Sequence, residues 1–386
     1  MVGRISMPRL LRVGAGASLH LPEALKDLGC RKPLLVTDSF LSKSGVLKPV
    51  QAALSEASMV HHTFDGAVPD PTTASLDEGI AAALMHESDV IVGFGGGSAM
   101  DSAKAIAVMA VHGGHLSRFK VPAEAPVGLP IVAVPTTAGT GSEVTKVSIV
   151  IDSVTEEKML IMGAGMLPDA ALVDYELTMA KPYRLTADSG LDTFCHAMEA
   201  YVSKKATPFT DTLALAAASA TVKHLPTACA TPSDRQAREG MMLAATQAGL
   251  AFSNASVTLI HGMSRPIGAR FHVPHGLSNA ILLPKVTEFS LKGAPSRYAD
   301  ISRACGFASA AETSDAAACK SLVDGLMELT TSLKVPTMSE FGIGRESFDP
   351  HLETMAEQAL ASGSPANNPV VPTASELVTL YKEVYA

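Results

Sequence analysis

Residues 89–106 of this 386-residue chain read DVIVGFGGGSAMDSAKAI, and this stretch decides the class of fold. The apolar run DVIVGF is typical of a buried strand, and the residues after the glycines have the spacing of a helix. Gly95, Gly96 and Gly97 let the backbone approach a phosphate closely, and Ser98 begins a helix whose N–H groups can hold a pyrophosphate. The alternative is that these glycines form only a tight turn.

Strands and helices are predicted to alternate on both sides of this stretch. Apolar runs bounded by turn residues predict buried strands at residues 33–38, 130–137 and 170–174, and the segments between them have helical spacing. Such alternation indicates a Rossmann-like parallel sheet covered by helices on both faces. Segments 145–152 and 157–162 predict an inserted antiparallel hairpin.

The second half of the chain has a different character, because strand signals almost vanish beyond about residue 184. Long segments rich in alanine, serine and methionine follow, and they are typical of closely packed helices. We therefore expect an α/β dinucleotide-binding domain over residues 1–183 and an all-helical, metal-binding catalytic domain over residues 184–386. The boundary lies near KPYRLT (181–186), where a proline follows the last strand.

A second loop, VPTTAGTGSEVT at 134–145, also begins directly after a predicted strand. Its glycines supply backbone freedom, and its hydroxyl groups come from Thr136, Thr137, Thr140 and Ser142. Open parallel sheets bind ligands at the carboxyl ends of their strands, so two such loops predict a binding crevice at that edge.

Asp38 ends the predicted strand at 33–38. A carboxylate at this place accepts hydrogen bonds from an adenosine ribose and repels a 2′-phosphate, which favours NAD over NADP. The alternative is an aspartate that only starts the following turn.

Four side chains of the second half have the chemistry of metal ligands. Asp192 and His196 are four residues apart in a predicted helix and therefore lie on one face. His261 and His275 lie in later apolar segments flanked by glycine and proline. One carboxylate oxygen and three imidazole nitrogens suit a divalent transition metal such as Fe(II) or Zn(II). The alternatives are a surface ion pair for the first two and hydrogen-bonded core histidines for the others.

Composition limits the classes of function. Hydrophobic residues make up 47 % of the chain and charged residues 18 %, as in a compact globular enzyme. The net charge of −8 argues against nucleic acids and anionic membranes as partners, and no apolar run is long enough to span a bilayer. The N-terminus lacks the features of a signal peptide, and the five cysteines lack CxxC spacing, so we expect a cytoplasmic protein.

Taken in order, these motifs resemble the iron-containing (group III) alcohol dehydrogenase family. They cover nearly the whole chain: VTD at 36–38, VPDPT at 68–72, GGGSAMDSAK at 95–104, PTTAGTGSEVT at 135–145, then GLDTFCHAMEAYVS and HGMSRPIG–FHVPHG. The resemblance implies an NAD-binding α/β domain, an all-helical domain and an active site in the cleft between them. It also implies reversible hydride transfer between an alcohol carbon and the nicotinamide ring, with the metal as Lewis acid.

Carried over residue by residue, the resemblance implies a set of metal ligands, namely Asp192, His196, His261 and His275. The expected cofactor-binding set is made up of Asp38, Gly95, Gly96, Gly97, Ser98, Asp101, Thr136, Thr137, Thr140, Ser142 and Lys158. The resemblance implies that Gly96, Gly97 and Ser98 form the pyrophosphate loop. Within this set, Asp38 selects NAD, and Thr136 and Thr137 contact the nicotinamide side. Lys158 reaches the cofactor ribose in the family, although a solvated hairpin charge is the alternative.

The chain departs from the family pattern at Arg265. Many relatives carry a histidine there, four residues after the third ligand, which is implicated in proton relay. A guanidinium stays protonated near neutral pH and cannot act as a general base. Our hypothesis is that Arg265 binds a carboxylate or phosphate of the substrate or cofactor, and pairing with a helix acid is the alternative. His272 is a second candidate for the relay, with an exposed loop histidine as the alternative.

Related functions remain open at this point. They are a polyol dehydrogenase resembling glycerol dehydrogenase, a hydroxyacid dehydrogenase, a lyase resembling dehydroquinate synthase and a metal-free reductase resembling maleylacetate reductase. The metal is expected to be Fe(II), with zinc or manganese in its place as alternatives. The expected partners are a small alcohol or aldehyde and further copies of the chain in a homodimer or larger homo-oligomer.

Overall fold

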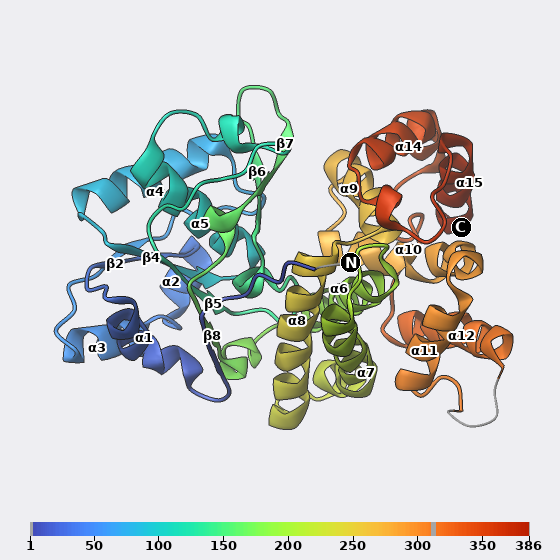
Figure 1. Cartoon of the computed structure of the whole chain (residues 1–386), viewed down its shortest axis with the longest axis horizontal. Coiled ribbons are helices and arrows are strands. Elements are labelled where there is room, and N and C mark those ends of the chain that lie inside the picture. Colours follow the sequence, from blue (N-terminus) through green and yellow to red (C-terminus); the bar gives the residue numbers. More distant parts are fainter. Residues whose placement is uncertain (1–2, 310–313, 386) are drawn as a thin grey trace. The chain divides into compact units, whose positions relative to one another are not determined.

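A computed structural model of the chain describes residues 3–309 and 314–385. The chain forms two compact units (Figure 1). Residues 4–180 make up the first unit, and the residues from Lys181 onward, together with Gly3, make up the second. The assignment of a dinucleotide-binding domain to residues 1–183 and of a metal-binding catalytic domain to residues 184–386 stays a prediction.

The first unit is built on a six-stranded sheet in the order β1-β8-β5-β4-β2-β3, and every neighbouring pair is parallel. Its strands are β1 (Leu10–Val13), β2 (Pro33–Val36), β3 (His62–Phe64), β4 (Val90–Gly95), β5 (Ile131–Pro135) and β8 (Ala170–Val173). The four central strands are buried along their whole length, which is why they occur as continuous apolar runs in the sequence.

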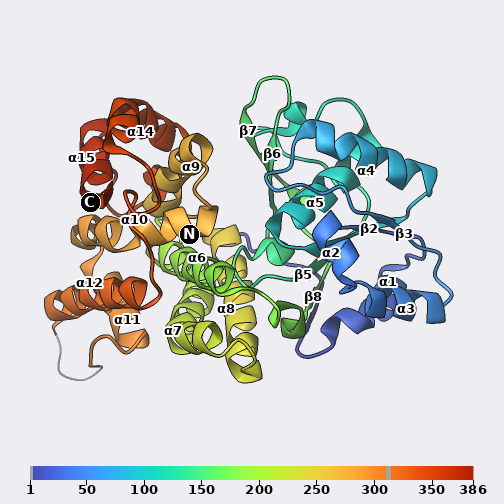
Figure 2. The same ribbon diagram turned by 180° about the vertical axis from the view of Figure 1, so that it is seen from behind.

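Helices cover both faces of this sheet (Figure 2). They are α1 (Leu21–Leu28), α2 (Ser39–Ser44), α3 (Lys48–Glu56), α4 (Thr73–Met85) and α5 (Gly97–His112). Because successive strand residues point to opposite faces, Leu34 and Val36 belong to one apolar core with α4 and α5, and Leu35 belongs to another with α1 and α3. This confirms the predicted Rossmann-like architecture.

Two antiparallel strands, β6 (Val147–Ile151) and β7 (Lys158–Met162), form the predicted hairpin. Short 3-10 helices complete this unit at η1 (Ala17–His20), η2 (Leu116–Phe119), η3 (Ser142–Val144), η4 (Ala164–Met166) and η5 (Tyr175–Thr178).

The second unit is helical throughout its described residues, as predicted. Its α-helices are α6 (Tyr183–Val202), α7 (Pro208–Ala230), α8 (Arg235–Ala255), α9 (Leu259–Phe271), α10 (His275–Ser290), α11 (Pro295–Ala304), α12 (Asp315–Ser332), α13 (Arg345–Phe348), α14 (Leu352–Ala361) and α15 (Ala374–Tyr385). Its 3-10 helices are η6 (Leu291–Gly293), η7 (Asp349–His351) and η8 (Pro365–Asn367).

Helix α6 is the centre of the second unit. Nearly all of its residues from Thr186 onward are buried, because α7, α8 and α10 pack around it. Polar side chains on this helix are therefore held away from water, where they need partners. Among the described residues, no helix is both long and apolar enough to cross a membrane.

Candidate metal centre and cofactor loops

The structure brings the four predicted metal ligands together in the second unit. Asp192 and His196 come from adjacent turns of α6, His261 from the first turn of α9, and His275 is the first residue of α10. One ligand atom of each residue lies within 4.8 Å of the others. Asp192 Oδ1 lies 3.5 Å from His261 Nε2 and 3.7 Å from His275 Nε2, and Asp192 Oδ2 lies 3.8 Å from His196 Nδ1.

A glycine allows α10 to begin against α6. An ideal Cβ at Gly276 would lie 2.5 Å from the carbonyl oxygen of Asp188 and 3.4 Å from Asp192 Cβ. Any side chain there would push the start of α10 away from α6. The His-Gly pair at 275–276 thus supplies both a predicted ligand and the close approach of the two helices that brings it to Asp192. The His275 side chain is 48 % exposed, whereas the other three residues are buried.

The protonation states of Asp192 and His196 suit metal binding, whereas that of His261 opposes it. Burial by itself would raise the pKa of Asp192, but the surrounding histidines hold it well below its usual range. Burial lowers the pKa of His196 to about 3, so its ring is neutral. Burial also opposes the charged form of His261, but the carboxylates of Glu199 and Asp192 raise its pKa to about 9. A cation that binds there would compete with a proton for His261.

One buried nitrogen supports the assignment of a ligand site. His196 Nδ1 has no hydrogen-bond partner within the part of the chain that the structure describes. The ring is stacked on Phe252, with centroids 4.1 Å apart, and on His261, with centroids 4.4 Å apart. A buried polar nitrogen without a partner is costly unless something binds it. The donor set of one carboxylate and three imidazoles fits a divalent transition metal.

Two further residues of this centre were not identified from the sequence. Asn279 Nδ2 donates to Asp192 Oδ1 (2.7 Å) and lies 3.1 Å from His261 Nε2 and 3.3 Å from His275 Nε2. Glu199 contacts His261 Nδ1. Both follow a predicted ligand at helical spacing, Asn279 by four residues and Glu199 by three, and this spacing was the signal that could have revealed them.

In the first unit, the two predicted cofactor loops adjoin each other. Strand β4 ends at Gly95, and α5 begins at Gly97. An ideal Cβ at Gly96 would lie 3.7 Å from Thr137 Cγ2, and one at Gly97 would lie 3.1 Å from Thr140 Cγ2. The glycine loop (residues 95–97) and the threonine loop (residues 134–145) therefore lie against each other at the carboxyl ends of β4 and β5.

The chain belongs to the iron-containing alcohol dehydrogenase family. Residues 8–175 match the family model described as "Iron-containing alcohol dehydrogenase", and residues 186–385 match that of the "Fe-containing alcohol dehydrogenase family, C-terminal". The protein is accordingly an oxidoreductase of the alcohol dehydrogenase type that acts on a small molecule. Membership of this family implies a metal, typically iron, and NAD(H) in general.

Relatives of this iron-containing alcohol dehydrogenase match it over nearly their whole length. The NAD-dependent methanol dehydrogenase of Bacillus methanolicus is 35 % identical over 96 % of each chain. The long-chain-alcohol dehydrogenase 1 of Geobacillus thermodenitrificans is 36 % identical, with 100 % of this chain and 97 % of the relative covered. The crystal structure of a 1,3-propanediol oxidoreductase superposes with a TM-score of 0.96 at 33 % identity, with both chains covered completely.

A buried lysine, not identified from the sequence, supports the threonine loop of this dehydrogenase. Lys104 Nζ donates to Ser142 Oγ (2.9 Å), to Thr145 O and Oγ1 (both 3.1 Å) and to Val147 O (2.8 Å). Asp101, one turn earlier on α5, accepts from Ser142 Oγ at 3.0 Å. Burial lowers the pKa of Lys104 to about 8, against the opposing effect of nearby carboxylates.

The same contacts bear on the predicted roles of Asp101 and Ser142. Asp101 also accepts a hydrogen bond from the backbone N–H of Ile149 at 3.0 Å, so it ties α5 to the hairpin. The hydrogen bond between Asp101 and Ser142 therefore fixes the threonine loop to α5. Their direct contact with a cofactor stays a prediction.

The remaining predicted cofactor residues are placed as follows. Asp38 caps α2, and its Oδ1 accepts a hydrogen bond from Leu41 N at 2.9 Å. Thr136 is buried, and its N–H donates to Gly95 O at 2.9 Å. Lys158 begins β7 and forms an exposed ion pair with Asp70 at 2.7 Å.

Arg265 and His272, the two predicted catalytic residues, both lie in α9 or at its end. Arg265 Nη1 donates to Ser364 Oγ at 3.0 Å, and burial lowers the pKa of its guanidinium. His272 is the exposed residue that ends the helix in the left-handed conformation, with φ of 54°. The left-handed turn is typical of a helix end.

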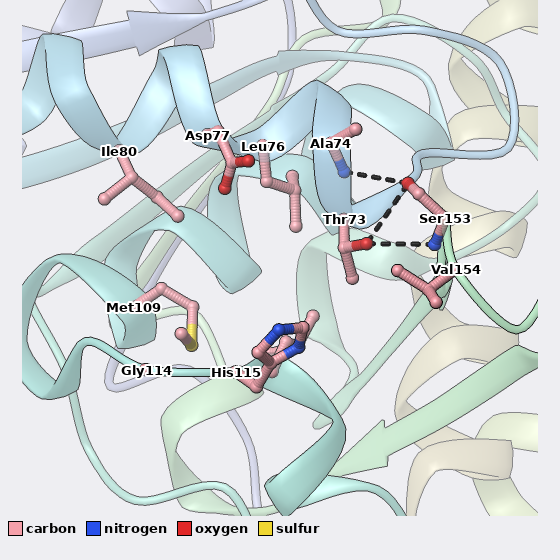
Figure 3. A pocket seen from close by; sticks show the side chains of 11 residues that line it. Thr73, Ala74, Leu76, Asp77, Ile80, Met109, Gly114, His115, Ser153 and Val154 are labelled. Atoms are coloured by element: carbon pink, nitrogen blue, oxygen red, sulfur yellow. Dashed lines mark hydrogen bonds between the residues drawn. The ribbon is translucent and has the colours of Figure 1, made fainter.

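A separate hollow of about 280 Å³ lies in the first unit (Figure 3). The start of α4, the residues before η2 and the β6–β7 turn line it. Thr73 and Ser153 hydrogen-bond to each other at its edge. None of the predicted site residues lines it, so it is distinct from the cofactor loops.

Proposed function

We propose that the protein is an NAD(H)-linked alcohol dehydrogenase in which Asp192, His196, His261 and His275 hold one divalent metal ion, Fe(II) or zinc or manganese in its place. The observation that carries this proposal is the convergence of their ligand atoms within 4.8 Å in the helical unit, with three of the four residues buried. A metal bound there supplies a Lewis acid that lowers the pKa of an alcohol hydroxyl. The ionised Asp192 and neutral His196 are in the states that metal binding requires.

The first unit is proposed to bind NAD, and the helical unit to bind the metal. The N-terminus of α5, with Gly96, Gly97 and Ser98, suits a pyrophosphate, because its dipole and N–H groups favour negative charge. Thr137 and Thr140 adjoin this loop and suit further cofactor contacts. Homo-oligomerisation and a cytoplasmic location stay predictions from the sequence.

Proton transfer and substrate anchoring are assigned to the helical unit. Arg265 is a permanent cation, so it suits a carboxylate or phosphate of the substrate or cofactor and not general-base catalysis. His272 is an exposed imidazole at the end of α9, and such a side chain can accept and release a proton in a relay. The substrate class is a small alcohol with its aldehyde or ketone, which fits relatives that act on methanol, a propanediol and long-chain alcohols.

The test of this function is metal content followed by turnover. The chain is purified without oxygen and loaded with Fe(II), and we expect about one metal ion per chain. Alcohols, diols and hydroxyacids are then oxidised with NAD while NADH absorbance is followed. Turnover that depends on the metal supports the proposal. A chain that holds no metal yet reduces a carbonyl substrate with NADH would instead be a metal-free, maleylacetate-type reductase.

Cofactor choice is tested separately by Asp38→Ser. Serine caps helices as aspartate does, so α2 is kept while the negative charge is removed. We expect the ratio of kcat/KM for NADP to that for NAD to rise about tenfold, because the interaction of two unit charges about 4 Å apart is worth about 1–4 kcal/mol. Asp38→Ala is the matched variant that also loses the cap, at a cost of about 1 kcal/mol in stability. An unchanged ratio in both variants would refute the role of Asp38.

A further inference from the structure

The buried carboxylate of Glu199 has a defined set of partners at the start of α9. Glu199 is only 1 % exposed and follows His196 by three residues on α6. Its Oε1 accepts hydrogen bonds from Thr258 Oγ1 (2.9 Å) and from the backbone N–H of Ile260 (2.6 Å), and its Oε2 contacts His261 Nδ1. A buried carboxylate is costly unless it is paired, so these contacts hold α9 against α6.

The contact with His261 determines which ring nitrogen is available to a cation. A carboxylate beside one imidazole nitrogen holds the ring proton there and leaves the other nitrogen to the metal. Because Glu199 contacts Nδ1, the nitrogen left is Nε2. This is the atom that lies 3.5 Å from Asp192 Oδ1 and 3.1 Å from Asn279 Nδ2. The ring is thus oriented with Nε2 toward the Asp192 carboxylate.

Charge balance also links Glu199 to the metal centre. Asp192 and Glu199 are both buried carboxylates, and a divalent cation carries two positive charges that need compensation in such a place. We propose that Glu199 is a positioning residue of the metal centre, which holds His261 with Nε2 as its metal-binding nitrogen and offsets one charge of the cation. This inference rests on the proposed function, because it requires His261 to be a metal ligand.

A different role for Glu199 is purely structural. Thr258 stands before the first residue of α9 without capping the helix through its own side chain, and Glu199 receives the N–H of Ile260 instead. On that view Glu199 serves only to cap α9. The two roles make different predictions for two single substitutions.

Glu199→Gln keeps an oxygen for Thr258 and Ile260 but places an NH₂ group against His261 Nδ1. The ring proton must then move to Nε2, the nitrogen that the metal needs. Thr258→Val removes the hydroxyl partner of Glu199 but keeps its charge and its contact with His261. Glu288→Gln, on the exposed face of α10, is the matched control.

The experiment titrates the metal-depleted full chain with Co(II) against a chelating indicator and records the visible spectrum of the bound ion. We expect Glu199→Gln to lower Co(II) affinity about 10- to 100-fold and to change the spectrum. Thr258→Val and Glu288→Gln should bind Co(II) nearly as the wild type does. Wild-type affinity in Glu199→Gln, or equal losses in Glu199→Gln and Thr258→Val, would overturn the inference in favour of the capping role.

A second measurement covers the case in which Glu199→Gln does not fold. Nitrogen-15 NMR of the Zn(II)-loaded wild type, labelled in histidine, should show His261 bound through Nε2 and protonated on Nδ1. Binding through Nδ1 would overturn the inference while leaving the metal site intact. If the wild type binds neither Co(II) nor Zn(II), the proposed function itself fails, and this inference fails with it.

Discussion

Replacement of His196 by phenylalanine is expected to remove both metal binding and alcohol oxidation. The substitution keeps an aromatic ring stacked on Phe252, where the ring centroids are 4.1 Å apart, but removes the ligand nitrogens. Loss of a ligand should lower metal affinity by more than the roughly 10- to 100-fold that loss of an outer partner costs. Turnover should fall roughly a thousandfold, since several kcal/mol of transition-state stabilisation are lost.

His196 is a better probe of the centre than His261. His196 Nδ1 has no hydrogen-bond partner among the described residues, so the phenyl ring breaks no hydrogen bond at that atom. Removal of His261 would instead deprive the buried Glu199 Oε2 of its imidazole partner and confuse loss of metal with loss of stability.

The measurements are metal content by mass spectrometry, NAD-linked oxidation of the best alcohol, and thermal unfolding of the metal-free protein. We expect the free energy of unfolding of the metal-free protein to change by no more than about 1.5 kcal/mol, as for other substitutions that nearly conserve side-chain volume. His20→Phe, at an exposed histidine of the first unit, serves as the control and should keep full metal content. Full metal content in His196→Phe would show that this residue is not a ligand.

Replacement of Lys104 by methionine is expected to destabilise the α/β unit by about 3–5 kcal/mol, as for other broken buried pairs. Lys104 is fully buried, and its ammonium group donates to four oxygens of residues 142–147. Methionine keeps an unbranched apolar stem but removes the ammonium group, so these acceptors lose their donor and the nearby carboxylates of Asp101 and Glu143 lose the charge of Lys104. For a unit of this size the midpoint of thermal unfolding should fall by roughly 10 °C.

A double variant separates the effect of charge from that of packing. In Lys104→Met with Asp101→Asn, one uncompensated carboxylate is also removed, so part of the lost stability should return, by about 0.5–3 kcal/mol. Lys320→Met, at an exposed ion pair on α12, is the surface control and should be nearly neutral. Circular dichroism gives the midpoint of thermal unfolding for Lys104→Met, for the double variant and for Lys320→Met. If Lys104→Met unfolds at the wild-type midpoint, the lysine does not support the loop.

The same lysine should influence cofactor binding through the threonine loop. Its contacts with Ser142 and Thr145 hold the segment that adjoins Gly96 and Gly97. Lys104→Met should therefore weaken NAD binding even at temperatures where the unit stays folded, which calorimetric titration with NAD would show.

Much of the fold could be predicted because the central strands are buried on both faces. The strands β2, β4, β5 and β8 carry continuous apolar runs for this reason, and the structure confirms each of them. The edge strands β1 and β3 were not predicted. They have only four and three residues, several of them partly exposed, so no continuous apolar run marks them.

The sequence by itself determined the alternation of the four central strands with helices, the position of the glycine loop, and the Asp192–His196 pair, because each depends on residues that are close along the chain. Only the tertiary structure decided which groups surround them. Glu199 contacts His261 across 62 positions, Asn279 contacts Asp192 across 87, and Lys104 contacts Ser142 across 38. These contacts arise where separate segments pack around buried charges. Helical spacing can place a side chain on a face, but packing alone determines what that face meets.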